Sequence, residues 1–430
     1  MGKNIFPIKP LAKALDTSFP ALNQDPLATS WPTVNVQIDS NRIKRRWDYI
    51  TDRTLATGAI GQYATLYKRG TGVTNTLFLT TTDLIKKDVT GTANKTWSYL
   101  TPKYTTGTIT NITGTPKVTV NGNTTLWTGA TPPVAGDQFI MDADLTSDEE
   151  ADASWRTIST VGGASTITLT SAYSDTLTGG NYRIRRLYSV PTDERWQFSV
   201  VNDVFCFTNG NVNVQKWDGS AATAVDIDAT NAVKARYCTC YANRLVLADM
   251  YLSSTRQPWT IKWSKEGDPT NWVDSTAGEI DFAETDEPIT GLGRVGNNLI
   301  VFKKNGYYVG SRTGVATGPF TFPTYKSGVG NWAPYSLVEA AGTCFWLGHD
   351  NFYVMNGQEW EPIGDAIKYE FFSRVNDTER TKVWGVPNPR HNEVIWWAMT
   401  GDGQRAFSFK YRENSWTTFT HPSLVTGFMK

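Results

Sequence analysis

Histidine and cysteine are scarce in this chain, which has three histidines and four cysteines among 430 residues. No stretch approaches the ~20 consecutive apolar residues of a membrane span. The first residues, MGKNIFPIKPLAK, contain no apolar signal-peptide core. These absences predict a protein that is made and kept soluble in a cytoplasm. Charge of one sign is not in excess either, because 41 Lys and Arg balance 41 Asp and Glu. This balance argues against a general nucleic-acid binder, which carries a basic excess.

The residues that could hold a metal or attack a substrate form no recognisable motif. None of the histidines has a second His or Cys at metal-ligand spacing. Cys238 and Cys240 fall on one face of a predicted strand, and we expect them to be reduced thiols that fill the core. The segment GLGRVG has the spacing of a dinucleotide fingerprint, but strand-like residues follow it where that fingerprint needs a helix. We therefore expect no enzymatic activity and no cofactor or metal.

Aromatic and β-branched residues are abundant, and they recur in a pattern. Aromatics make up 13% of the chain, with 17 tryptophans. A unit of strand, Asn/Asp/Gly turn and second strand repeats roughly every 35 to 50 residues, which is the period of propeller blades. The central turns VND, ANR, GNN and RHN each precede a hydrophobic run. These runs are VFCF, LVLA, LIVF and VIWW. We predict an all-β fold, a β-propeller of about six blades, in which residues 364–377 are the best helix candidate.

Two segments differ in style from these repeats. Residues 1–60 mix Pro, Ser, Asn and Asp too densely for regular elements and are predicted to form an extended N-terminal arm. Residues 104–188 are rich in Thr and Gly with short alternating runs, which predicts a small β-barrel or sandwich inserted into the first blade region. The propeller would then comprise residues 61–103 and 189–430.

The segment IKWSKEGDPTNW places a tryptophan on each side of a tight turn. Tryptophan could serve as a stacking platform for a sugar, but such clefts are singular, whereas tryptophans recur here at comparable places in the repeats. We interpret them as packing residues that cap the apolar space between blades. The recurring residues are Trp217, Trp263, Trp360 and Trp416, and the turn itself comprises Trp263, Gly267, Asp268, Pro269 and Trp272.

Acidic residues keep an enzymatic alternative open. A glycoside hydrolase needs two carboxylates that flank the scissile bond, and several carboxylates lie in loops between predicted strands, although no feature selects a pair. The alternative function is therefore a carbohydrate-binding or glycan-hydrolysing β-propeller. The loop from Asp142 to Trp155 is also acidic but lacks the residue order of an EF-hand, so we expect a solvated surface loop. The hydrolase candidates are Asp268, Asp281, Glu284, Asp286 and Glu287.

Residues 261–363 resemble the central signature of the tail nozzle (tail hub, head-completion) proteins of short-tailed bacteriophages. The resemblance lies in a strand ending in Trp-Ser before Gly-Asp-Pro-x-x-Trp, then Gly-x-Ile-Asp, Ile-Thr-Gly-Leu and the LIVFK strand. The segment GVGNWAPYSLVEAAGTCFWLGHDNFYVMNGQEW is similar too, as is the basic N-terminal stretch DSNRIKRRWDY. The inserted module looks like the small β-domain often carried by phage tail proteins.

The resemblance implies a structural virion protein that is made in the host cytoplasm and located in the tail. Its expected partners are five further copies in a hexameric ring, a head-to-tail adaptor, tail fibres or tailspikes, and a plug or needle. DNA would pass through the ring transiently, without sequence recognition. Candidates for subunit or partner contact are Arg42, Lys44, Arg45, Arg46, Asp148, Glu149 and Glu150, and candidates for facing the channel are Lys303 and Lys304.

Overall fold

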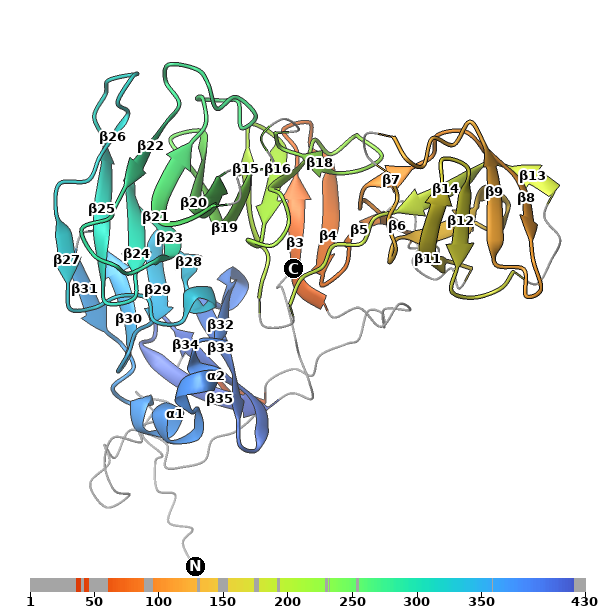
Figure 1. The fold of residues 1–430 in the computed structure, drawn as a ribbon. Coiled ribbons are helices and arrows are strands. Elements are labelled where there is room, and N and C mark those ends of the chain that lie inside the picture. Colours follow the sequence, from red (N-terminus) through yellow and green to blue (C-terminus); the bar gives the residue numbers. More distant parts are fainter. Residues whose placement is uncertain are drawn as a thin grey trace, which may run out of the picture.

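The computed structural model of this chain describes residues 36–39, 42–45, 61–88, 96–129, 132–145, 154–173, 178–191, 194–228, 231, 233–252, 255–357 and 359–420. Within these ranges regular structure is almost entirely antiparallel strand. Six small sheets are arranged as the blades of a β-propeller, so the predicted fold class is confirmed (Figure 1). No helix of the described part is long and apolar enough to cross a membrane.

Each blade follows the chain from its innermost to its outermost strand. Blade 1 is β3 (Gly61–Lys68), β4 (Thr74–Thr80), β5 (Leu84–Asp88) and β6 (Thr96–Tyr99), and blade 2 is β15 (Gln197–Val201), β16 (Val204–Thr208), β17 (Gln215–Trp217) and β18 (Val225–Asp226). Blade 3 is β19 (Lys234–Tyr241), β20 (Arg244–Leu252), β21 (Thr255–Trp263) and β22 (Gly278–Asp281). Blade 4 is β23 (Ile289–Val295), β24 (Asn298–Lys303) and β25 (Gly306–Arg312), with β26 (Phe320–Thr321) and β27 (Tyr325–Ser327) both paired to β25.

The last two blades enclose the only α-helices of the described residues. Blade 5 is β28 (Val338–Ala340), β29 (Thr343–Leu347), β30 (Phe352–Asn356) and β31 (Glu359–Pro362), and blade 6 is β32 (Trp384–Asn388), β33 (Glu393–Thr400), β34 (Gly403–Lys410) and β35 (Ser415–Thr420). Between them lie α1 (Lys368–Arg374) and α2 (Asp377–Arg380). Helix α1 falls inside the predicted helical segment. Short 3-10 turns occur at η2 (Asp142–Asp144), η3 (Pro334–Ser336) and η4 (Pro389–His391).

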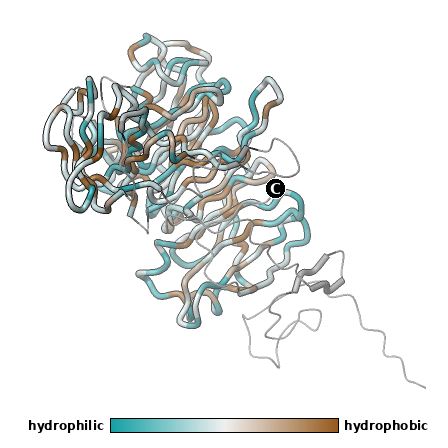
Figure 2. The backbone as a smooth tube through the Cα atoms, turned by 90° about the vertical axis from the view of Figure 1, so that its right-hand side faces the viewer, coloured by the Kyte–Doolittle hydropathy of each residue, from teal (hydrophilic) through white to brown (hydrophobic). Residues whose placement is uncertain are grey.

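The blades hold together because alternate residues of one strand point to opposite faces of its sheet. In β20, Val246 and Ala248 pack into the cluster shared by blades 3 and 4, while Leu245 and Leu247 pack into the cluster shared with blade 2. The same division occurs in β24 and β29. A strand buried on both faces must be apolar throughout, which accounts for the runs LVLA and LIVF. Figure 2 shows hydrophobic and hydrophilic residues interleaved along the backbone.

Tight turns join the first two strands of several blades. Asn202 and Asp203 have φ values of 46° and 63°, and Ala242 and Asn243 have 51° and 55°. Positive φ at both central residues is typical of the two-residue hairpin turn that matches the twist of antiparallel strands. Asn and Asp adopt this conformation more readily than most residues, which explains why these turns were visible in the sequence.

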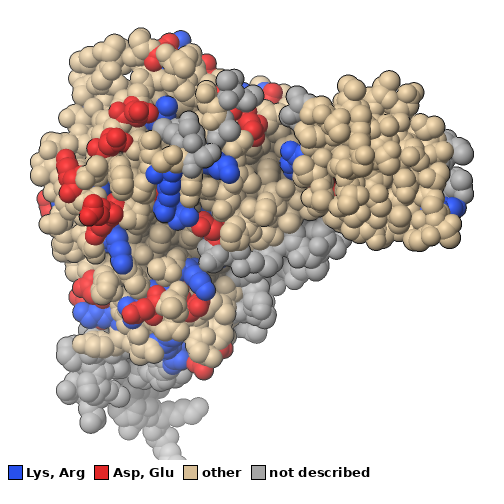
Figure 3. All heavy atoms as spheres, viewed as in Figure 1, with Lys and Arg blue, Asp and Glu red and all other residues tan. Residues whose placement is uncertain are grey.

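An eight-stranded sheet is inserted in the chain between the last strand of blade 1 and the first strand of blade 2. It stands at the right of the molecule in Figure 1. Its strands are β7 (Lys103–Tyr104), β8 (Thr108–Thr113), β9 (Thr119–Asn123), β10 (Gln138–Met141), β11 (Arg156–Gly163), β12 (Thr166–Leu169), β13 (Thr178–Gly180) and β14 (Tyr182–Arg185). Trp127, Phe139 and Tyr182 lie at the centre of its separate core. On the face seen in Figure 3 this module carries few charged residues, whereas charges of both signs are mixed over the blades.

The arm contributes one described hairpin, β1 (Val36–Asp39) with β2 (Arg42–Arg45). Strand β1 lies near β35, the outermost strand of blade 6. This hairpin therefore lies beside the last blade.

A buried arginine joins the inserted module to blade 1. Arg185 Nη1 lies 3.2 Å from Asp83 Oδ1, and the two side chains are 0% and 1% exposed. The guanidinium carbon of Arg185 also lies 3.5 Å from the ring centroid of Tyr99 and 4.7 Å from that of Trp155. Burial raises the pKa of the Asp83 carboxyl, and the charge of Arg185 opposes that shift. Because neither side chain is in contact with water, each charge is stabilised mainly by the other.

Replacing Arg185 with methionine should lower the free energy of unfolding by about 3 kcal/mol, because Asp83 would stay buried without its counter-charge. The control is Arg183→Met two residues earlier, where Arg183 and its partner Asp142 are 35% and 36% exposed. That control should cost less than about 1 kcal/mol. Urea unfolding followed by tryptophan fluorescence measures both. Equal stability of the two variants would contradict a structural role for the buried pair.

Candidate functional site: the Trp263 turn and the propeller axis

The two tryptophans of the family-like segment pack into two different cores. Trp263 ends β21, is 4% exposed, and lies 5.2 Å from Phe320 of blade 4 between ring centroids. Its Nε1 donates to the carbonyl oxygen of Thr276 at 3.2 Å. Trp272 is half-buried and packs against the cluster shared by blades 2 and 3. The tryptophans therefore lie on opposite sides of blade 3 as packing residues.

The Gly-Asp-Pro turn between them connects neighbouring blades. Gly267 has a φ of +73°, and its N–H donates to the carbonyl oxygen of Asn243 at 2.7 Å. Asn202 of blade 2 donates through Nδ2 to the carbonyl oxygen of Gly267 at 2.9 Å. The Asp268 carboxylate accepts from the hydroxyl and the N–H of Thr270, and these hydrogen bonds lower its pKa. Pro269 is buried. The turn thus links blade 2 to blade 3.

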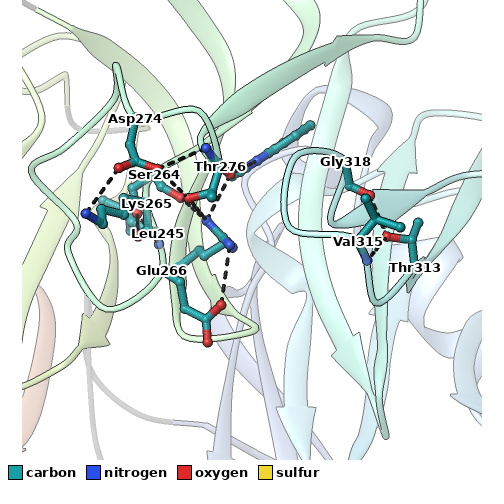
Figure 4. Close-up of polar contacts among 11 residues, drawn as sticks. Leu245, Ser264, Lys265, Glu266, Asp274, Thr276, Thr313, Val315 and Gly318 are labelled. Carbon is teal, nitrogen blue, oxygen red and sulfur yellow. Dashed lines mark hydrogen bonds and ion pairs between the residues drawn. The ribbon is translucent and has the colours of Figure 1, made fainter.

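The loop that follows the turn is ordered by charged side chains (Figure 4). Asp274 accepts from Thr276 N at 3.0 Å and Thr276 Oγ1 at 2.8 Å, and its carboxylate lies 3.1 Å from Lys265 Nζ. The backbone and side-chain hydrogen bonds of Thr276, followed by that of Lys265, lower the pKa of Asp274 to about 2. Buried Arg244 donates to the carbonyl oxygens of Ser264 and Thr276, both at 3.0 Å.

Asp274→Asn should lower the melting temperature at pH 7, because the folded state favours the charged form of Asp274. Its folded pKa of about 2 lies below its ordinary value of 3.8, so this stabilisation is present above pH 3.8 and is lost as the pH falls toward 2. The difference in melting temperature between wild type and variant should therefore shrink as the pH falls from about 4 to about 2. A difference independent of pH would contradict the assignment of the effect to this charge. Differential scanning fluorimetry provides the measurement.

The prediction that Lys303 faces a channel is wrong, because its side chain is buried inside the subunit. Its side chain is fully buried at the end of β24, and Nζ donates to the carbonyl oxygen of Phe282 and to Thr285 Oγ1, the latter at 2.7 Å. Burial lowers the pKa of the Lys303 ammonium group, and the nearby Glu287 opposes that shift. Lys303 therefore fastens the loop from blade 3 onto blade 4. Its neighbour Lys304 is exposed.

Lys303→Met should destabilise the fold by about 1 to 3 kcal/mol, because buried acceptors on Phe282 and Thr285 would lose their donor. Lys304→Met is the matched control, and a change at that exposed position should stay within about 0.5 kcal/mol. Chemical denaturation of the two variants separates the cases. A Lys303 variant as stable as the Lys304 variant would show that the buried ammonium contributes no net stability.

The other candidate residues are placed as follows. Trp217 and Trp416 are each 2% exposed, as packing residues should be, but Trp360 on β31 is 36% exposed and does not cap an inter-blade space. Trp360 packs against Tyr353 of the adjacent strand in its own blade, with ring centroids 5.3 Å apart, whereas Trp416 packs into the cluster shared by blades 5 and 6. Arg42, Lys44 and Arg45 lie on β2, where Arg42 is opposite Asp39 and Lys44 is opposite Gln37. Arg46, Asp148, Glu149 and Glu150 lie outside the described residues.

Two cavities lie on the propeller axis, which the sequence did not reveal. The first has a volume of about 420 Å³ and reaches the C-terminal ends of the innermost strands. The second, of about 370 Å³, lies at their N-terminal ends. Tyr237, Pro334 and Tyr335 line both cavities and so stand between them. All six blades contribute to the first cavity, for example through Tyr63, Phe198, Cys238, Leu292, Val338 and Gly385.

The polar groups of the first cavity are engaged with one another. Arg294 of blade 4 forms an ion pair with Glu339 of blade 5, with Nη2 2.7 Å from Oε2. The guanidinium carbon of Arg195 lies 4.4 Å from the ring centroid of Trp384, which connects blade 2 with blade 6. Burial lowers the pKa of Arg195 to about 10. Contacts of this kind tie the inner strands together around the axis.

Four of the five carboxylates that kept hydrolysis open have structural partners, Asp268 among them as described above, and the fifth, Asp286, is exposed. Glu284 accepts from the hydroxyl of Tyr308, Glu287 accepts from Asn305 N at 3.1 Å, and Asp281 accepts from Thr260. Each axial cavity contains a single carboxylate in its lining, Glu339 in the first and Glu194 in the second. No group of three or more His, Cys, Asp or Glu residues in the described ranges is placed to hold a metal ion.

Two further motifs also form parts of the core. GLGRVG lies in β23 and the turn to β24, and a Cβ on Gly293 would approach Cys344 Sγ to 2.7 Å, so this glycine allows close packing of blades 4 and 5. The expected strand after the motif is confirmed. The four cysteines are free thiols, of which Cys206, Cys238 and Cys344 are buried and Cys240 is half-buried.

Comparisons with known proteins give no family. No protein-family model and no curated protein matches the chain. Among solved structures, PorZ of Porphyromonas gingivalis, a bacterial surface component of a type-IX secretion system, is 14% identical over 86% of this chain and 39% of its own, with a TM-score of 0.34. The extracellular domain of BT4673, a putative hybrid two-component system from B. thetaiotaomicron, is 9% identical over 82% and 38%, also with a TM-score of 0.34.

A third similar structure is the Neurospora crassa Pan2 WD40 domain, 10% identical over 63% of this chain and 76% of its own, with a TM-score of 0.34. This chain spans less than half the length of PorZ and of the BT4673 domain. Likeness at this level carries no argument about activity or partners.

Proposed function

We propose that this chain is a structural, non-enzymatic subunit of the tail nozzle of a short-tailed bacteriophage. Six copies would form a ring below the head-to-tail adaptor and continue the channel through which DNA leaves the capsid. Tail fibres or tailspikes and a plug or needle would dock on this ring. The proposal rests on the resemblance of residues 261–363 to that family.

The observation that carries the proposal is the role of the Trp263 turn in the fold. The segment with the most specific resemblance packs one tryptophan into each side of blade 3 and hydrogen-bonds blade 2 through Gly267. A segment that serves architecture supports a subunit whose task is to keep its shape under mechanical load. Balanced charge, with 41 residues of each sign, suits a conduit that DNA must pass without being held.

The carbohydrate alternative has one favourable observation and one against it. Trp360 is 36% exposed, so its ring is partly available for stacking on a sugar. Against hydrolysis, the single carboxylates of the two axial cavities, Glu339 and Glu194, each pair with an arginine. Paired carboxylates within about 5 to 10 Å of each other are what glycoside hydrolysis requires. We therefore rank the nozzle first.

Cryo-electron microscopy of purified phage particles tests the proposal. We expect density for the six-bladed propeller in a six-fold ring at the tail, repeated once per subunit. An antibody or tag on the chain should label the same place. If the chain is missing from purified particles, the nozzle assignment fails. If the wild-type chain binds glycans on an array and Trp360→Ala abolishes that binding, the carbohydrate function replaces it.

A further inference from the structure

The second axial cavity is lined by polar residues of which some, Lys304 and Thr290 among them, have no side-chain partner in the described part of the chain. It has a volume of about 370 Å³, within the range of small-ligand sites. It opens where the innermost strands of blades 2 to 6 begin, and its lining comes from strand ends and from the loops before these strands. The lining residues used below are Glu194, Arg236, Thr290, Lys304, Trp332 and Lys382.

Positive charge is in excess around this cavity. Lys304 has no hydrogen bond or ion pair with any described residue, and Lys382 Nζ lies 3.3 Å from a partly exposed carboxylate, that of Glu379. The only carboxylate in the lining, Glu194, is already occupied: it lies 3.0 Å from Arg236 Nη2 and accepts from the hydroxyl of Tyr335 at 2.7 Å. An anion entering the cavity would therefore meet the Lys304 ammonium group, which has no counter-charge among the described residues, and that of Lys382, whose counter-charge on Glu379 lies outside the lining.

Two buried polar atoms in the lining have no hydrogen-bond partner among the described residues. One is Oγ1 of Thr290, whose residue is 7% exposed, and the other is Nε of Arg236. The nearest recorded oxygen to that Nε is Oδ2 of Asp249, at 3.8 Å. Buried polar groups are nearly always satisfied, so an unsatisfied one at the wall of a cavity points to a missing ligand. Both of these atoms can donate a hydrogen bond.

We propose that this cavity binds a phosphate group, either as a free phosphate or as the phosphate of a nucleotide. A phosphate monoester carries a charge of about −1.5 to −2 at pH 7 and three strong acceptor oxygens. Lysine binds phosphate as a point charge and needs no planar fork, which suits Lys304 and Lys382. The hydroxyl of Thr290 supplies a neutral donor, and Nε of Arg236, whose charge is already paired with Glu194 and Asp249, supplies a second donor. Because the planar fork of Arg236 is already engaged with Glu194, bidentate recognition of a carboxylate is not favoured.

The proposal uses only the residues of this cavity and does not depend on the nozzle assignment. Isothermal titration calorimetry of the full chain at low salt tests it, with sodium pyrophosphate, a deoxynucleoside monophosphate, and a short oligonucleotide carrying a 5′-phosphate or a 5′-hydroxyl as probes. We expect pyrophosphate to bind and the affinity to fall as salt is raised. A preference for the mononucleotide over pyrophosphate would identify a nucleotide ligand, and a preference for the 5′-phosphorylated over the 5′-hydroxyl strand would identify a DNA end.

The double variant Lys304→Met, Lys382→Met should weaken pyrophosphate binding at least tenfold, and Thr290→Val should weaken it several-fold. Lys68→Met, an exposed lysine at the end of β3, is the matched control and should bind as the wild type does. Circular dichroism of every variant checks that the fold is retained. Absence of heat with all phosphate probes, binding unchanged in the double variant, or citrate bound as tightly as pyrophosphate would each overturn the proposal.

Discussion

Burial of both faces of every inner strand is the constraint on which this fold depends. A single four-stranded sheet cannot cover its own two apolar faces, so each blade needs a neighbour on either side. Leu245 and Leu247 face one neighbour while Val246 and Ala248 face the other, and the same division recurs in β24 and β29. Radial repetition meets this need and leaves only short outer strands with an open edge. Removing a blade would expose two apolar faces at once, which makes the arrangement cooperative.

Polar contacts secure the same interfaces at their edges, where water competes with packing. The Gly267 turn bonds to Asn202 across blades 2 and 3, and Lys303 holds the loop between blades 3 and 4. Arg294 and Glu339 connect blades 4 and 5 beside the axis. Hydrogen bonds contribute little net energy in water, but leaving a buried partner unmatched is costly. Such contacts therefore fix the angle between blades more than they add to stability.

Local patterns predicted what depends on local rules. The apolar runs and the Asn-rich turns predicted the blades because burial on both faces and positive φ leave direct signatures in sequence. Lys303 was misplaced because a Lys-Lys-Asn-Gly turn reads as solvated, and its burial comes from a loop some 20 residues earlier folding over it. Arg185 and Asp83 are separated by 102 positions, so their pairing leaves no local signal. Both axial cavities were equally hidden, because residues from separate blades meet only after the sheets have closed around the axis.

The size of the axial cavities bears on how a ring of such subunits could pass DNA. The larger measures about 420 Å³, the scale of a small-molecule site, and Tyr237, Pro334 and Tyr335 stand between it and the second. A duplex cannot pass along that axis. If the nozzle proposal holds, the channel must run between copies, past the outer strands and turns of several subunits. The residues that DNA meets would then be surface residues, whose mixed charges, visible on the blades in Figure 3, would let the duplex slide past without a continuous basic track.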